Sequence, residues 1–190
     1  MKRAVEVGGW VLVALLVWLG WPSAERRVPG GSLAERLLGP VAELAADLQW
    51  VRTHDALRRG DVALAFARAE SALALAPGAT GGWLFLARYL AFDRASEERE
   101  VDPERRRAAV AAGLELARRG EACAREPAEL ALWQGLVRVK EAEEGDLAWP
   151  GGARVLLGDA VADFERAAEL GHADGAELAA GTRRRLAALP

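Results

Sequence analysis

Histidine and cysteine, the side chains that most often bind transition metals or act as activated nucleophiles, are few in this 190-residue chain. It has two histidines, His54 and His172, and one cysteine, Cys123, and the three lie far apart in the sequence. Metal sites need several ligands at short spacing, and a nucleophilic cysteine needs a base beside it. We therefore expect no metal ion, no cofactor and no catalytic residue, and we interpret Cys123 as a small side chain in a helix core.

Other signatures of chemistry are also absent from the sequence, which has no Gly-x-Ser-x-Gly motif, P-loop or GxGxxG motif. The acidic residues Glu141, Glu143, Glu144 and Asp146 form a cluster. A calcium loop needs oxygen ligands at many alternating positions, so we interpret this cluster as the solvated end of a helix and the loop after it. We expect that the chain is not an enzyme and has no small-molecule substrate.

Two short arginine clusters, within 104–109 and 182–189, are the features closest to a nucleic-acid site. On a helix, consecutive arginines point about 100° apart, so three in a row do not form one basic stripe. No aromatic residues alternate with them, and the formal net charge of the chain is −3. These observations argue against nucleic acid as a partner.

The elements that hold these side chains are expected to be helices, because Ala, Leu, Arg and Glu dominate the sequence. We predict an all-α fold with a first long helix over 41–59, ended by Gly60, and with Asp61 as the N-cap of the next helix. That next helix carries small residues at Ala65, Ala69 and Ala72 before Pro77 stops it.

The run from Gly60 to Pro77 resembles the second helix of a tetratricopeptide repeat (TPR), a unit of about 34 residues in which two antiparallel helices pack closely. The first-helix pattern follows at Trp83, and Trp133 starts a further match after Pro127. Late in the chain the spacing of a second helix recurs at Ala160, Phe164 and Ala167.

The resemblance implies a short TPR-like α-solenoid of about three helical hairpins plus a capping helix. We expect the hairpins at 41–76, 82–125 and 128–170, with insertions at 96–102 and 143–159. A closing helix over 174–188 carries Arg183, Arg184 and Arg185, which suits the polar outer face that the end of such a stack needs.

In TPR stacks the first helices line a concave groove, and the residue five positions after the tryptophan faces it. Carried over to this chain, that rule selects Arg88 and Arg138, with Leu84 and Gln134 one turn before them. In the first repeat it selects His54, or Asp55 one residue later. Two guanidinium groups in one groove bind carboxylates well. In the alternative interpretation, Arg88 and Arg138 pair with nearby acids of the chain such as Glu141.

The first 24 residues contain an apolar segment, 4–21, whose helical length of about 27 Å matches a bilayer core. A signal peptide would place a small residue three positions before the cut, where Pro22 stands if cleavage follows Ala24. A buried soluble helix is disfavoured by the long apolar run. We expect a single-pass membrane anchor over 1–24, a linker and short helix over 25–40, and a helical-repeat domain over 41–190.

Residues 35–95 also resemble predicted membrane-anchored TPR-like proteins of unknown function, through Leu38-Gly39, Trp50, Arg52 and Trp83. Together these features predict a membrane-anchored scaffold that binds a protein or peptide in an envelope or transport complex. We expect its C-terminal domain outside the cytoplasm, since short N-terminal tails commonly stay inside. The alternative is a structural subunit whose transmembrane helix makes the main contacts.

Overall fold

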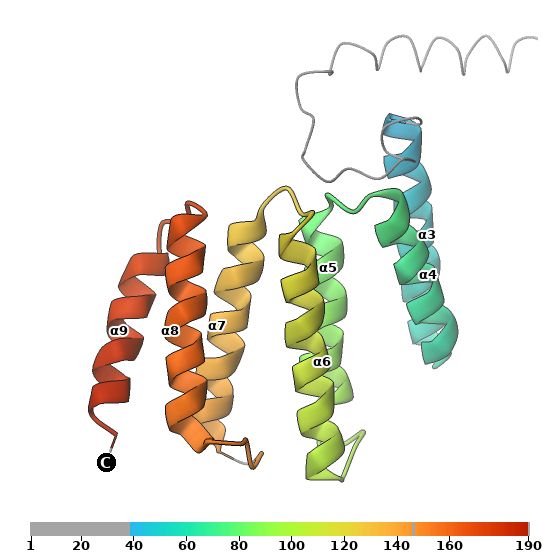
Figure 1. Ribbon diagram of the computed structural model, residues 1–190. Coiled ribbons are helices and arrows are strands. Elements are labelled where there is room, and N and C mark those ends of the chain that lie inside the picture. The colour runs from blue at the N-terminus through green and yellow to red at the C-terminus, as the bar shows by residue number, and fades with distance from the viewer. Residues whose placement is uncertain (1–38, 146, 190) are drawn as a thin grey trace, which may run out of the picture. The chain divides into compact units, whose positions relative to one another are not determined.

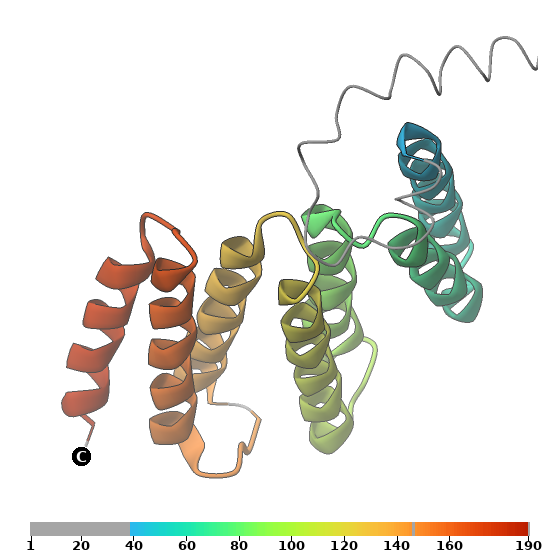
Figure 2. The ribbon, with the colours of Figure 1, turned by 45° about the horizontal axis from the view of Figure 1, so that its top comes forward.

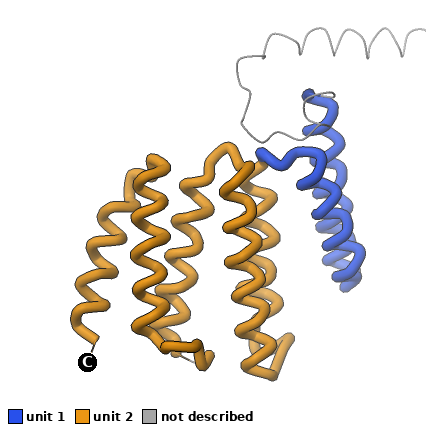
Figure 3. Tube along the Cα trace, in the orientation of Figure 1, with its two compact units in different colours: residues 1–78 blue, residues 79–190 orange. Residues whose placement is uncertain are grey.

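The computed structural model describes residues 39–145 and 147–189, and in these ranges it is entirely helical, as the sequence predicts. The expected anchor at 4–21 and short helix before residue 39 lie outside the described residues. No helix of the described ranges combines the length and the apolar character needed to cross a membrane. The chain divides into two compact units, residues 1–78 and 79–190, which Figure 3 shows in different colours.

The described part of the first unit is a hairpin of helices α3 (Pro40–Arg58) and α4 (Val62–Leu75), seen in Figure 1. Gly60 adopts a φ of 76° in the turn, a conformation that costs glycine little, and the Asp61 side chain accepts a hydrogen bond of 3.1 Å from the Leu64 amide. Both residues act as expected. The two helices bury small side chains, listed here: Ala42, Ala46, Thr53 and Ala56 on α3, and Ala65, Ala69 and Ala72 on α4.

The second unit begins with α5 (Thr80–Arg88), which continues as a π-helical turn, η2 (Tyr89–Arg94). Helices α6 (Pro103–Glu121), α7 (Pro127–Glu144), α8 (Gly152–Glu169) and α9 (Gly175–Ala187) follow. Within this unit each helix from η2 onward packs on its predecessor in the chain, and α5 also contacts α7 (Figure 2). The second and third predicted hairpins therefore form, with α9 as the closing helix.

Three features of the helices differ from those predicted. The π-helical turn was not expected, and α6 ends at Glu121 rather than near residue 125. The predicted insertion over 143–159 is shorter, because α8 already begins at Gly152. Asp102 is the N-cap of α6: its carboxylate accepts a hydrogen bond of 2.9 Å from the Glu104 amide, with Pro103 at the first helical position.

Glycines allow the helices of the second unit to approach closely. A β-carbon at Gly113 would lie 2.7 Å from the Ala87 carbonyl oxygen, and one at Gly120 would lie 2.7 Å from Cγ of Trp83. Gly135 makes a similarly close contact, in its case with the Phe164 ring. Helical glycine costs about 1 kcal/mol relative to alanine, but at these positions a larger residue would push the helices apart.

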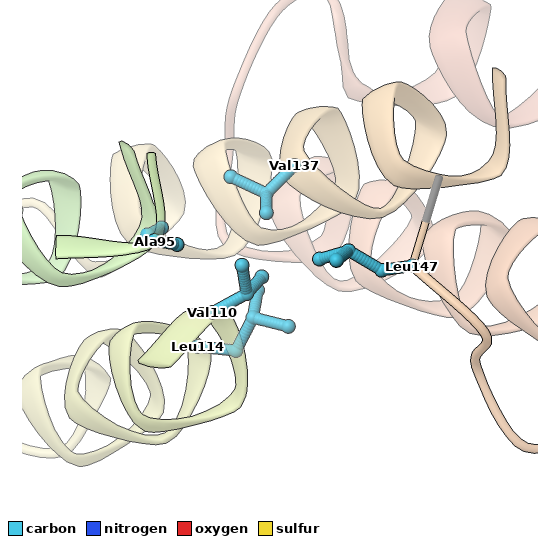
Figure 4. Close-up of a cluster of buried hydrophobic side chains, with 6 residues drawn as sticks. Ala95, Val110, Leu114, Val137 and Leu147 are labelled. Atoms are coloured by element: carbon cyan, nitrogen blue, oxygen red, sulfur yellow. The ribbon is translucent and has the colours of Figure 1, made fainter. Parts of the chain in front are cut away.

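An apolar cluster of the second unit joins η2, α6, α7 and the loop after α7. Its buried members converge in Figure 4 and are Ala91, Ala95, Val110, Leu114, Val137 and Leu147. Phe92 and Trp133 pack against this cluster and meet edge to face, with ring centroids 6.2 Å apart. The cluster thus ties η2 and α6 to α7.

Candidate binding surface on α5 and α7

The five residues predicted to line a groove occupy three different environments. Arg88 is exposed and Leu84 half-buried on α5. His54 is exposed on α3, in the first unit. Gln134 and Arg138 lie on α7, where Gln134 is only 1% exposed. The structure therefore keeps Arg88 at the surface, buries Gln134, and leaves Arg138 half-buried in the second unit, with its side chain 19% exposed.

Arg138 turns toward α8 instead of a groove. Its guanidinium bonds the carboxylate of Asp163 and lies 3.8 Å from Asp159. The alternative from the sequence, pairing with a nearby acid such as Glu141, is thus right in kind, but the acids come from α8. The predicted placement of Arg138 in a groove is therefore corrected.

Gln134 belongs to the same polar network, which links three helices. Its amide donates to the carboxylate of Glu121 at the end of α6 and, at 3.3 Å, to the Leu130 carbonyl oxygen. Arg166 of α8 donates to Glu121 at 2.8 Å and to Asp163 at 2.7 Å. Because its partners are inside the protein, Gln134 does not line an accessible groove, contrary to the prediction.

Charge in this network is largely screened from solvent. Asp163 is 4% exposed, and burial raises the pKa of its carboxyl above the usual value, although the guanidinium groups of Arg138 and Arg166 act in the opposite direction. The network has two arginines facing two carboxylates, Glu121 and Asp163. Such a balanced and mutually bonded set is a structural element that fixes α6, α7 and α8 in register.

A β-carbon at Gly135 of α7 would collide with the Phe164 ring of α8, and in the α5–α6 hairpin the Ala87 carbonyl lies against Gly113. We align Gly135 with Ala87 because each is the first-helix residue at such a close contact. Counting from these two residues, Arg88 corresponds to Leu136 and not to Arg138. Both occupy exposed positions, and Leu136 is 46% exposed. Counting from Trp133 placed the register two residues too far along the helix, because Trp133 packs on the cluster beside η2.

Leu136 is therefore the surface residue that the sequence-based rule missed. The signal was present in the sequence as Gly135, the glycine of the Trp133–Leu136 segment, since the TPR first-helix pattern has a glycine at the point of closest helix approach. Together with Leu84 and Arg88 of α5, Leu136 forms what we call the first-helix surface. It combines an exposed cation with a large apolar side chain.

A cavity of about 270 Å³ lies at the end of α5 and α7, between η2, α6 and α7. Its polar lining includes Lys140, whose ammonium bonds Glu144, lies 3.4 Å from Glu141 and sits 5.6 Å from the centre of the Phe92 ring. Burial lowers the pKa of Lys140, but the hydrogen bonds and charges of Glu144 and Glu141 outweigh it and raise the pKa above its usual value.

Glu141 differs from its solvated neighbours in the acidic cluster, since it is 3% exposed. Its carboxylate accepts a hydrogen bond of 3.3 Å from the Trp149 indole nitrogen and faces Lys140. The interpretation of the whole cluster as a solvated helix end is corrected at this residue. Of the ionisable residues that line the cavity, Lys140 thus bonds Glu141 and Glu144, and Arg106 pairs with Glu97.

The remaining candidate residues carry no assembled site in the described ranges. No group of three or more His, Cys, Asp or Glu side chains there is arranged to hold a metal ion. Cys123 follows the end of α6 and is partly exposed, rather than buried within the helix as predicted. His172 lies 3.5 Å from the Glu129 carboxylate in the turn before α9.

Comparisons of the chain with protein-family models, with curated proteins and with solved structures found no match.

Proposed function

We propose that the chain is a membrane-anchored, TPR-like scaffold that binds another protein or a peptide through the first-helix surface of α5 and α7. The proposal is supported by the pairwise packing of successive helices, by the contact between α5 and α7, and by the glycines at the helix crossings. In a helical-repeat protein, alternate helices contribute one continuous surface to partners.

The observation that carries this proposal is the equivalence of Arg88 and Leu136. With Gly135 aligned to Ala87, the two residues occupy the same position in their helices, and both are exposed. Arginine and large apolar side chains supply much of the energy at protein interfaces, because they combine apolar area with directed hydrogen bonds. An extended peptide with an apolar residue and a carboxylate matches this pair.

The membrane part of the proposal concerns residues 4–21, which form the anchor, with the repeat domain outside the cytoplasm in an envelope or transport complex. It is supported by the apolar length of the segment and by the missing cleavage signal after Ala24. Protease added to intact cells and to lysed cells tests the orientation. Digestion of the domain only after the cytoplasm is opened would contradict the external location.

Photo-crosslinking in cells tests the binding surface in the full chain. We expect a photoreactive phenylalanine analogue at Leu136 or Arg88 to capture a partner. Val155 of α8 is a matched control, because it is 47% exposed and does not belong to the first-helix surface. The adduct at position 136 should weaken when Arg88 is changed to alanine. Equal capture at position 155, or no adduct at either test position, would contradict the proposal.

Deleting residues 1–24 distinguishes this proposal from the alternative function, a structural subunit held by its transmembrane helix. If partners depend on the anchor alone, the deletion abolishes every adduct even when partner and deleted chain are mixed in detergent. Binding through the first-helix surface predicts that the adduct at position 136 survives under those conditions.

A further inference from the structure

Helix α3 carries an apolar row on the side that does not face α4. Its members are exposed by 42% at Val41, 71% at Leu44, 50% at Leu48 and 66% at Val51. Successive members are three, four and three residues apart. This is the spacing of positions a and d in the heptad repeat abcdefg, through which one helix packs lengthwise against another.

The opposite side of α3 already has its partner. The residues at positions b and f, Ala42, Ala46, Thr53 and Ala56, are buried, and α3 packs against α4 within the hairpin. The helix therefore has a small-residue face that is occupied and a heptad face, which we call the α3 seam, that α4 leaves uncovered within the first unit. A helix with two apolar faces needs a second partner.

The charges beside the α3 seam select that partner. Asp47 stands at position g and Arg52 at position e of the next heptad, both are exposed, and neither forms an ion pair with another residue of the described ranges. In parallel helix pairs, a residue at g reaches the residue five positions later, at e, on the other helix. Asp47 of one chain then pairs with Arg52 of an identical chain, and the reverse pair forms by symmetry.

We infer that the α3 seam binds the α3 seam of a second copy of the chain in a parallel pair. Leu44 and Leu48 form the centre of the contact, and the two Asp47–Arg52 pairs flank it. An antiparallel pair would not align these opposite charges in the same way. A parallel pair also keeps both N-termini at the same end, as two chains anchored in one membrane require.

The extent of the seam limits its affinity. From Val41 to Val51 it is about 15 Å long, and the next a position is Asp55, which pairs with Arg58 at 2.9 Å and Arg59 at 2.8 Å in its own chain. In a parallel pair the two Asp55 carboxylates would face each other, and their like charges would end the contact there. We expect self-association with a Kd in the range of about 1–100 μM, the range of small interfaces, rather than a permanent dimer.

Charge reversal of the full chain in mild detergent tests the pairing by sedimentation equilibrium. Asp47→Arg or Arg52→Asp alone should weaken dimerisation about tenfold or more, because like charges then face each other. The double variant D47R/R52D restores the pairs and should recover dimerisation. Both sites are exposed, and circular dichroism verifies that the variants stay folded. A monomeric parent chain, or a double variant as weak as the single ones, would overturn the inference.

Cysteine cross-linking tests the direction of the pair. In a Cys123→Ser background, Leu44→Cys should oxidise rapidly to a disulfide-linked dimer, because position d meets position d in a parallel pair. Val155→Cys, which is similarly exposed, is the control. Faster linking of Leu44→Cys to Leu48→Cys in a mixture of the two variants would indicate an antiparallel pair and contradict the inference. The inference would also be overturned if the chain were monomeric and the cysteines on the α3 seam were protected from thiol reagents. In that case another part of the same chain covers the α3 seam.

Discussion

Gly135 of α7 and Phe164 of α8 are in such close contact that a β-carbon on Gly135 would lie 2.5 Å from Cε1 of the Phe164 ring. The ring is 1% exposed and has little space into which it can move. This contact sets the distance between the two helices and, with it, the register that places Leu136 at the surface.

Gly135→Ala is therefore expected to destabilise the protein by about 1–3 kcal/mol, through overpacking, despite the better helix propensity of alanine. The free energy of unfolding in urea, followed by circular dichroism, measures the effect. Gly158→Ala is the matched control, since Gly158 lies inside α8 and a β-carbon there meets no atom within 4 Å. It should stabilise by about 0.5–1 kcal/mol. Equal effects of the two changes would refute the close contact.

Glu121→Gln is expected to destabilise the second unit by about 1–3 kcal/mol, because the Arg166 guanidinium loses one of its two carboxylate partners in a largely buried network. The Glu121 side chain is 13% exposed, and its partner Arg166 is 37% exposed. Glu165→Gln provides the control at the exposed pair with Arg183, where about 0.5 kcal/mol or less is expected. Thermal unfolding of both variants makes the comparison, and a larger effect at Glu165 would contradict the assigned network.

Lys140 is one of two lysines in the chain, the other being Lys2, so NMR of ¹³C-dimethylated protein resolves its titration. We expect Glu144→Gln to lower the pKa of Lys140, which the native contacts raise above its usual value. Since the folded pKa is raised, the stabilisation by Glu144 is complete below about pH 10.5 and is lost as the pH rises through the folded pKa. Glu143→Gln should leave the Lys140 titration unchanged. An effect as large as that of Glu144→Gln would show that the neighbours are misassigned.

Trp149→Phe should cost about 1–2 kcal/mol, because the ring still covers the apolar cluster but the nearly inaccessible Glu141 carboxylate loses its indole donor. Adding Glu141→Leu removes the carboxylate as well. The double variant should be less destabilised than the sum of the two single variants, and a double-mutant cycle measures the difference. Strict additivity would mean that the two groups do not interact.

Local signals in the sequence predicted the helices well. Gly60 and Asp61 divided α3 from α4, and Asp102 with Pro103 began α6, because caps act on neighbouring backbone groups and need no tertiary information. The small residues of α4 also lie inside, as their spacing indicated.

Long-range partners were not predictable in the same way. Arg166 and Glu121 are 45 positions apart, and nothing local marks them as a pair. The register of α7 was misjudged because a tryptophan was weighted above a glycine, although the space available at the helix crossing is what selects the residue. The π-helical turn at Tyr89–Arg94 has no local signal in the sequence that we recognised.

Helix α9 packs chiefly on α8, and the second unit as a whole is joined by contacts between successive helices. Such an assembly has no central core that must break all at once, so its outermost helix can open while the inner pairs stay closed. Amide hydrogens of α9 should then exchange with solvent deuterium sooner than those of α7. Loss of order would begin at the C-terminal edge and advance inward one helix at a time.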